Sequence, residues 1–279
     1  MFTSLNDKAL HLRSLHHDGV LVLPNAWDAG SAVLFREAGA RAVGTTSGGV
    51  SWAHGSPDGQ HLTRTRMTAA ASAIAEAVPG LPVTVDVEGG YGPDPRDVAA
   101  TVEEAVAAGA AGINLEDSTA PGGPLFTVAE QAARLRAARE AAVSRGVPDL
   151  VINARTDVVL FGVGDPDGRP AALRARAAAY EEAGADCLFV PGMTGLDDLK
   201  SLTADVALPV NVMAGPGAPD VAALRDAGVR RVSVGTALTQ VAYTAALRAA
   251  RELLDSGTYA SCEGTLDYGT LNGWFDRAG

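Results

Sequence analysis

Short apolar runs alternate with longer stretches of helical periodicity along most of the chain. At four junctions a helical stretch ends in an Ala-Gly pair, at Gly39, Gly109, Gly184 and Gly228, and the next apolar run begins within two or three residues. Glycine suits the left-handed position that ends a helix, so these junctions predict helix-to-strand turns that feed a parallel sheet. The predicted strands are 20–23, 42–45, 83–86, 112–115, 150–153, 187–190, 210–213 and 231–234, and the predicted helices lie around 30–38, 66–78, 95–108, 127–144, 169–183, 196–204, 218–227 and 236–255.

Eight such strand-helix units favour an α/β fold of the closed (β/α)8 barrel type. An open doubly wound sheet usually has fewer strands and a G-x-G-x-x-G fingerprint after its first strand, whereas Pro24-Asn25-Ala26-Trp27 follows the first run here. We expect an extra helix at residues 4–18 and a barrel domain over residues 1–255. Residues 256–279 are rich in aromatic side chains and are expected to form a helical tail, packed on its own barrel or exchanged with a neighbouring subunit.

Composition and charge limit the classes of partner. Acidic residues outnumber basic ones by 33 to 22, and the bases are scattered, so neither nucleic acid nor an anionic membrane is expected to bind. The two cysteines, Cys187 and Cys262, provide neither a disulfide framework nor a metal-binding spacing. No signal-peptide pattern begins the chain, and no apolar run reaches the roughly 18 residues of a membrane span. A cytoplasmic protein is the expectation.

Candidate chemistry gathers where the predicted strands end, which in a (β/α)8 barrel is the active-site face. Asp86 and Glu88 are two residues apart, so they face one side of an extended strand, and Glu116 ends the neighbouring strand about 5 Å away. Three carboxylates this close repel one another unless a cation lies among them. Because the set contains only oxygen ligands, it favours Mg²⁺, with Mn²⁺ as the alternative, over Zn²⁺. The ordinary interpretation of each acid is a solvated loop residue.

Other strand ends offer groups that bind carboxylates. Arg155 ends the fifth strand and provides a planar fork for a substrate carboxylate, although it also suits an ion pair with Glu116. The backbone N–H groups of Thr46-Ser47-Gly48-Gly49 follow the second strand and suit an anion nest. The only lysines, Lys8 and Lys200, end no strand, so Schiff-base chemistry is not expected.

In combination and order, five motifs make the chain resemble the isocitrate lyase and phosphoenolpyruvate mutase superfamily. The resemblance runs from about Pro24 to Leu253. It implies a (β/α)8 barrel that binds Mg²⁺ and a 2-oxo acid and makes or breaks a bond next to a pyruvate-type enolate. The motifs lie at residues 46–50, 55–58, 85–92, 112–117 and 153–157.

The resemblance also implies roles for individual residues. The metal shell, partly through water, would be Asp86, Glu88, Glu116 and Asp58. The substrate carboxylate would be held by the backbone of Thr46, Ser47 and Gly48 together with Arg155, and Asn211 after the seventh strand is a further substrate-binding candidate. Tyr91 would lie over the substrate, and His54, Tyr91 and Ser118 are open candidates for the general acid. Many relatives exchange a C-terminal helix, which implies a homo-oligomer, either dimer or tetramer.

The departures from the family pattern are equally informative. The lyases have a Lys-Cys-Gly-His loop after the fourth strand and the mutases have Lys and Asn there, whereas residues 118–124 read Ser-Thr-Ala-Pro-Gly-Gly-Pro. Val190-Pro191-Gly192 replaces a glutamate, and the Thr-Glu that follows the lyase asparagine is missing after Asn211. The part of the site that binds metal and 2-oxo acid is therefore kept, and the part that selects the leaving group has changed.

The favoured reaction is carbon–carbon cleavage of a small 2-hydroxy or 2-oxo dicarboxylate. The alternatives are a mutase-like isomerase or hydrolase of a P–C bond, and a barrel that binds 2-oxo acids without catalysis. A further alternative is a phosphosugar barrel, whose phosphate would lie on the glycines near the last helix, namely Gly192, Gly215, Gly217 and Gly235.

Overall fold

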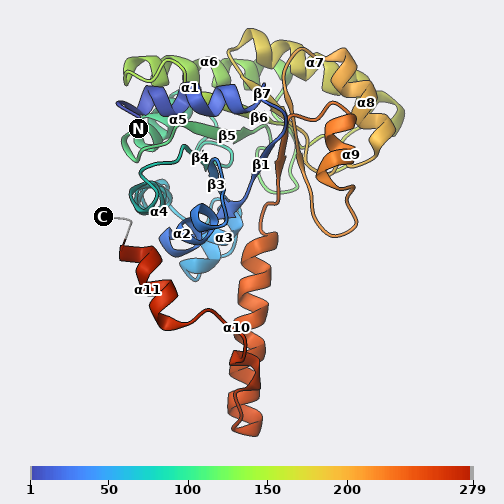
Figure 1. Ribbon diagram of the computed structural model, residues 1–279. Helices are drawn as coiled ribbons and strands as arrows, with labels where there is room; N and C mark the ends of the chain where they lie inside the picture. The colour runs from blue at the N-terminus through green and yellow to red at the C-terminus, as the bar shows by residue number, and fades with distance from the viewer. Residues whose placement is uncertain (1, 277–279) are drawn as a thin grey trace.

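The chain folds into a closed parallel barrel, which confirms the predicted (β/α)8 architecture. The computed structural model describes residues 2–276. All strand pairs are parallel, and the sheet order is β1-β9-β8-β7-β6-β5-β4-β3-β2 (Figure 1). The strands are β1 (Leu21–Leu23), β2 (Asn25–Ala26), β3 (Val43–Thr45), β4 (Val83–Asp86), β5 (Gly112–Glu116), β6 (Val151–Arg155), β7 (Cys187–Phe189), β8 (Val210–Met213) and β9 (Arg231–Ser233).

The barrel closes at Pro24, which separates β1, the first predicted strand, from β2, which was not predicted. β1 pairs with β9 and β2 pairs with β3, so one continuous segment joins the two edges of the sheet. Proline has no N–H to donate, and an interruption of the ladder is expected there. The neighbouring Asn25 side chain compensates, since its Nδ2 donates to the Thr45 carbonyl at 2.9 Å and its Oδ1 accepts from the Val234 N–H at 2.9 Å.

Helices surround the barrel in the predicted order, with one addition. The first, α1 (Leu5–Leu15), begins with a capping box in which Ser4 and Asp7 each accept the other's backbone N–H. The short α3 occupies residues 47–53, where the sequence predicted only a loop. The remaining helices are α2 (Ala29–Glu37), α3 (Ser47–Ala53), α4 (Arg64–Ala77), α5 (Pro95–Ala107), α6 (Val128–Ser144), α7 (Arg169–Glu182), α8 (Leu196–Asp205), α9 (Val221–Asp226), α10 (Ala237–Ser256) and α11 (Tyr268–Asp276), with short 3-10 turns η1 (Pro166–Gly168) and η2 (Ala260–Cys262).

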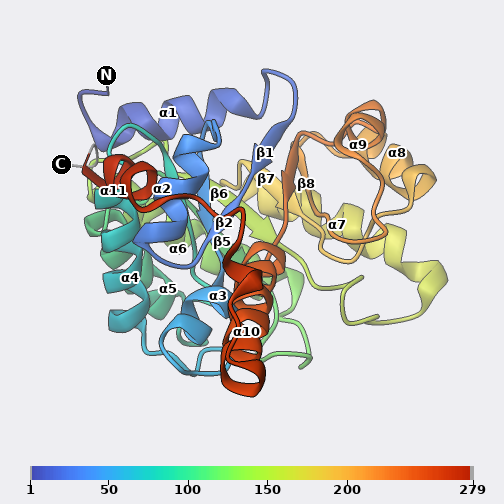
Figure 2. The same ribbon diagram turned by 60° about the horizontal axis from the view of Figure 1, so that its bottom comes forward.

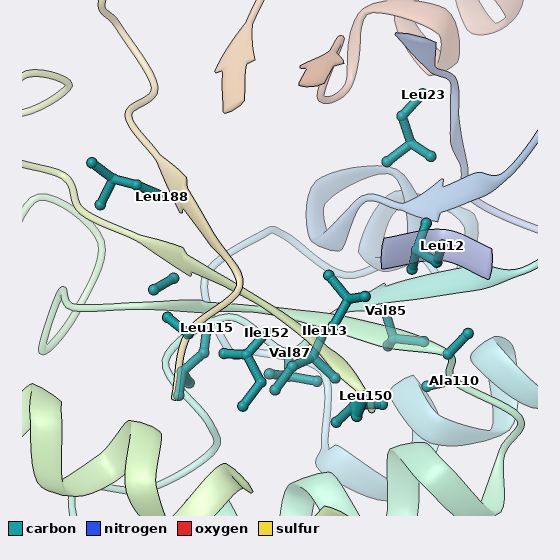
Figure 3. Close-up of a cluster of buried hydrophobic side chains, with 14 of the residues drawn as sticks. Leu12, Leu23, Val85, Val87, Ala110, Ile113, Leu115, Leu150, Ile152 and Leu188 are labelled. Atoms are coloured by element: carbon teal, nitrogen blue, oxygen red, sulfur yellow. The ribbon is translucent and has the colours of Figure 1, made fainter. Parts of the chain in front are cut away.

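The hydrophobic core consists mainly of aliphatic side chains, as the low aromatic content predicts. Figure 3 shows Val85, Ile113 and Ile152 from adjacent strands lying together, and all three are buried. From α1, Leu12 packs on the start of β5, where a Cβ added to Gly112 would lie 2.9 Å from the Leu12 Cδ2 atom. α1 therefore covers the N-terminal ends of the strands and leaves the opposite end free for a site.

The C-terminal region leaves the barrel instead of completing its outer layer. α10 projects away from the strands, and the chain then returns so that α11 lies beside α2 (Figures 1 and 2). Arg36 of α2 donates to the Trp274 carbonyl at 2.8 Å, which ties α11 to the barrel. Thr239 is the one buried residue of α10. The tail is helical as predicted, and its last three residues, 277–279, lie outside the described residues.

Within residues 2–276, no helix combines the length and the apolar character that crossing a bilayer requires.

Candidate active site

A cavity of about 310 Å³ opens at the C-terminal ends of the strands. Its wall contains seven of the residues that the sequence singled out. They come from four strand ends and from the loop before α4, so only the closed barrel brings them together. These seven residues are Thr46, Ser47, Asp58, Asp86, Glu88, Glu116 and Arg155.

Asp86 is held at the end of β4 by backbone donors. Its Oδ2 accepts the Ser47 N–H at 3.1 Å, and its Oδ1 accepts the Glu88 N–H at 3.2 Å. Burial raises the pKa of Asp86, although Arg155 opposes the shift. The predicted anion nest at residues 46–49 is thus the N-terminus of α3, and the Ser47 N–H already binds a carboxylate of the protein itself.

Glu88 lies two residues after Asp86, in a strained backbone conformation. Its φ angle of 50° lies in the left-handed region, which non-glycine residues seldom adopt. Its Oε2 accepts the Gln60 N–H at 2.6 Å and its Oε1 accepts the Tyr91 hydroxyl at 2.9 Å. Burial, reinforced by the charge of Asp86, raises the pKa of Glu88 to about 7.

Glu116 and Arg155 face each other across β5 and β6. Arg155 Nη1 lies 2.8 Å from Glu116 Oε2, and its Nε lies 2.7 Å from Asp157 Oδ1. Burial raises the pKa of Glu116 to about 8, and Arg155 reduces that rise. Burial alone would lower the pKa of Arg155, but Glu116 and Asp157 raise it above its usual range. The ion pair weighed for Arg155 is therefore present, and Arg155 also lines the cavity; its role in holding a substrate carboxylate stays a prediction.

The acids of this cavity fit a hard divalent cation. Four carboxylates line it, from Asp58, Asp86, Glu88 and Glu116, against the single cation Arg155 among the described lining residues. Across residues 2–276, no three His, Cys, Asp or Glu side chains converge closely enough to hold a metal by themselves. Mg²⁺ characteristically keeps several waters and takes few protein oxygens directly, so this donor set suits it.

Comparison with known proteins identifies the family of this barrel. A family model described as phosphoenolpyruvate phosphomutase matches residues 12–254. The chain belongs to the phosphoenolpyruvate mutase and isocitrate lyase superfamily. The resemblance inferred from the five motifs is confirmed.

Three similar proteins illustrate the superfamily. An uncharacterized protein of Mycobacterium tuberculosis is 38% identical over 247 residues, which cover 88% of this chain and 90% of that protein. The 2,3-dimethylmalate lyase of Eubacterium barkeri is 36% identical over 195 residues, covering 67% of this chain and 64% of the lyase. The structure of oxaloacetate acetylhydrolase in complex with its product oxalate matches with a TM-score of 0.85 at 27% identity, covering 97% of this chain and 94% of the other. Relatives of this kind, lyases and mutases, support an enzyme.

The loop that departs from the superfamily pattern closes one side of the cavity. Ser118 and Leu125 form a β-bridge, and the Thr119 N–H donates to the Pro124 carbonyl at 2.9 Å, so residues 118–125 form a small hairpin. Pro121 at its tip lines the cavity. Ser118 is buried behind it, and its Oγ donates to Asp157 Oδ2 at 2.6 Å. The Ser118 hydroxyl thus supports the carboxylate that orients Arg155.

Four other residues that were predicted to belong to the site do not line the main cavity. Tyr91 points its hydroxyl at Glu88 and borders a smaller neighbouring cavity. His54 ends α3, with its Nδ1 2.9 Å from the Val50 carbonyl. Asn211 is fully buried in the barrel, 3.4 Å from the Ser233 Oγ. Gly48 leaves room for the Asp58 side chain, because a Cβ at residue 48 would lie 3.0 Å from the Asp58 Oδ2 atom. Their roles remain predictions.

Two residues that shape the site, Gln60 and Asn114, were not predicted from the sequence. Gln60 links two loops, since its N–H binds Glu88 and its Oε1 accepts the Tyr91 N–H at 3.0 Å. Asn114 lines the cavity, and its Oδ1 accepts from Asn153 Nδ2 at 2.6 Å and from the buried Arg231 Nη2 at 3.3 Å. Asn114 lies within the motif at residues 112–117. No local sequence pattern indicates Gln60, because its contacts with Glu88 and Tyr91 form only when the loop is folded.

Proposed function

We propose that the protein is a Mg²⁺-dependent carbon–carbon lyase that acts through a pyruvate-type enolate on a small 2-hydroxy or 2-oxo acid, with Mn²⁺ able to replace Mg²⁺. The observation that carries this proposal is the convergence of Asp86, Glu88 and Glu116 with Arg155 on one cavity of about 310 Å³. The lyases among the superfamily relatives support the reaction class.

The residues of the site would have three separate roles. Asp86, Glu88, Glu116 and Asp58 would hold the cation, partly through water, and the bound cation would lower the cost of negative charge on the substrate oxygens. Arg155, fixed by Glu116 and Asp157, offers a rigid donor fork to the substrate carboxylate. Pro121 and Phe161 border the cavity.

Hydrogen exchange of pyruvate tests enolate formation without knowledge of the substrate. An enzyme that stabilises this enolate should replace the methyl protons of pyruvate with deuterium in D₂O, and ¹H NMR should show a Mg²⁺-dependent loss of the methyl signal that EDTA prevents. Binding of oxalate with Mg²⁺ but no exchange would support the non-catalytic barrel. Failure of both measurements would refute the proposed site.

A phosphonomutase-like activity is the second candidate, favoured by the description of the matching family model. ³¹P NMR with phosphoenolpyruvate would reveal it as a new P–C resonance. The phosphosugar hypothesis has less structural support, since Gly235 lines the cavity but Gly192, Gly215 and Gly217 do not.

Metal binding should depend on pH because it requires ionised carboxylates. The pKa of Glu88 is raised from 4.5 to about 7 and that of Glu116 from 4.5 to about 8. The affinity for Mg²⁺ should therefore increase from pH 6 to pH 8.5, with release of protons. Calorimetry in buffers of different ionisation enthalpy measures both effects, and an affinity independent of pH would contradict the assignment.

The same shifts affect the stability of the metal-free protein. A carboxyl whose pKa is raised by folding binds more protons in the folded than in the unfolded state, so stability falls as pH rises. The stabilising contribution of Glu88 and Glu116 to the free energy of unfolding should therefore be lost between about pH 4.5 and pH 8. Mg²⁺ should raise the melting temperature more at pH 8.5 than at pH 5.5, and Glu116→Gln should reduce that difference.

The apolar surface of α10 supports assembly into a homo-oligomer, and a second copy of the chain is the proposed partner. Leu247 and Leu254 are seven residues apart, on one helix face, with exposed fractions of 50% and 83%. A double Leu247→Glu, Leu254→Glu variant should sediment as a smaller species than the wild type. Val143→Glu, on the exposed surface of α6, is the matched control and should leave the mass unchanged. A monomeric wild type would contradict the proposal.

A further inference from the structure

A neutral amide lies in the wall of the active-site cavity, one layer below the carboxylates. Asn114 and Glu116 are two residues apart on β5, so their side chains point to the same face of the strand, and both line the cavity. Glu116 ends the strand, whereas Asn114 lies deeper in the barrel and is 8% exposed. Neither the metal contacts nor the carboxylate contacts proposed above involve Asn114, so its amide is a separate polar group of the cavity.

Two buried donors fix the orientation of this amide. The Asn114 Oδ1 atom accepts from Asn153 Nδ2 at 2.6 Å and from Arg231 Nη2 at 3.3 Å. A guanidinium has only donors, so the atom of Asn114 that contacts Arg231 has to be the carbonyl oxygen. The Nδ2 group is therefore the part of the side chain that remains for the cavity, and no described residue accepts a hydrogen bond from it.

Packing alone does not explain the position of Arg231. It lies on β9, which pairs with β1 and β8, so its side chain has to cross the barrel interior to reach Asn114 on β5. Arg231 is 1% exposed, and no carboxylate of residues 2–276 pairs with it. Its Nε and Nη1 atoms are buried without a partner, which leaves Asn114 as its one side-chain contact for hydrogen bonding among the described residues. A buried cation without an acid costs stability, which favours a functional reason for this contact.

We infer that the Asn114 amide donates from Nδ2 to an oxygen of the substrate, and that Arg231 is the positioning residue that holds the amide in this orientation. The inference rests on the proposed function, because the 2-oxo or 2-hydroxy acid supplies the oxygen acceptor. Asn114 is not a metal ligand in this arrangement, since its Oδ1 already accepts two hydrogen bonds and Mg²⁺ binds oxygen atoms. A fixed amide donor stabilises an oxygen that gains negative charge and, unlike Arg155, adds no charge to the cavity.

Removal of the Asn114 amide should separate ligand binding from metal binding. In calorimetry at pH 8 with saturating Mg²⁺, Asn114→Ala should weaken oxalate about tenfold or more, the loss expected for a hydrogen bond to a charged ligand. The affinity for Mg²⁺ alone should stay unchanged. Asn114→Asp keeps the oxygen that accepts from Arg231, so it should retain the fold and still weaken oxalate. Asn272→Ala, on the exposed surface of α11, is the matched control and should bind oxalate as the wild type does.

The results for oxalate and Mg²⁺ distinguish this inference from the proposed function. If the wild type binds oxalate with Mg²⁺ and both Asn114 variants bind it equally well, only this inference fails. If Asn114→Ala loses Mg²⁺ itself, Asn114 acts through the metal, and this inference fails as well. If the wild type binds no oxalate, the proposed function fails, and this inference fails with it.

A double-mutant cycle tests the positioning role of Arg231. Arg231→Met leaves no acid without its cation, so it should fold, and it should weaken oxalate about fivefold or more by releasing the Asn114 amide. In the Asn114→Ala background the same change should have no further effect on oxalate affinity. Arg231→Lys keeps a donor and should bind oxalate more tightly than Arg231→Met. A purely structural role would weaken oxalate equally in both backgrounds, and that result would overturn the assignment of Arg231.

Discussion

Replacement of Asp86 by alanine is expected to abolish Mg²⁺-dependent binding of oxalate, weakening it at least 100-fold. Asp86 lies at the centre of the carboxylates that line the cavity, and two backbone N–H groups orient it. Removing it takes away a metal ligand and also releases the Ser47 N–H. Asp86→Asn preserves an oxygen acceptor for that N–H but not the charge, so it should keep the fold and still lose the metal. Calorimetry with Mg²⁺ and oxalate measures the effect.

The control for Asp86 is an acid of the same type outside the cavity. Asp197 is exposed in the first turn of α8, and Asp197→Ala should bind oxalate as the wild type does. Removal of Asp86 also removes a charge that raises the pKa of Glu88. The metal-free variant should consequently bind fewer protons at Glu88 near neutral pH. Equal binding of oxalate by wild type and Asp86→Ala would exclude this site as the metal centre.

Replacement of Arg155 by methionine is expected to affect both binding and stability. Arg155 compensates the buried charges of Glu116 and Asp157, and its loss leaves two acids without a cation. Breaking a buried ion pair from one side costs about 3–5 kcal/mol, so urea unfolding should show a loss of that order. Oxalate binding should also be lost, because the donor fork is gone. Arg155→Lys keeps the positive charge but lacks the planar guanidinium that contacts Glu116 and Asp157 together. It should therefore restore the free energy of unfolding more than it restores oxalate binding.

An exposed arginine provides the comparison for Arg155. Arg174 pairs with Asp205 at 3.1 Å, and both side chains are nearly half exposed. Such surface pairs contribute at most about 1 kcal/mol, so Arg174→Met should change the unfolding free energy little and oxalate binding not at all. If Arg155→Met were as stable as Arg174→Met, Arg155 would not compensate buried negative charge, and the charge balance described for the site would be wrong.

The altered loop distinguishes this site from the superfamily pattern. Residues 118–125 lack the reactive side chains that the resemblance implies for a lyase, and the hairpin places Pro121 at the cavity while Ser118 turns inward to Asp157. An apolar residue of this loop therefore borders the cavity, and no reactive side chain of the lyase pattern does.

The strands and the strand-end chemistry were determined by the sequence alone. The predicted strands 83–86 and 210–213 coincide with β4 and β8, because apolar runs bounded by glycine turns are local signals. The barrel rule then places every strand end on one face, which is why Asp86, Glu116 and Arg155 could be named together. Their local motifs carried enough information to identify the family.

What the tertiary structure decided concerns contacts between segments distant in sequence. The hydrogen bond from Ser118 to Asp157 and the Gln60 contact with Glu88 depend on how loops pack across the barrel. The closure on either side of Pro24 depends on the pairing of β1 with β9 and of β2 with β3. The lining of the cavity is the clearest case. Pro121, Phe161 and Met213 are ordinary apolar residues in the sequence, and only the closure of the barrel brings them to the cavity that the carboxylates also line.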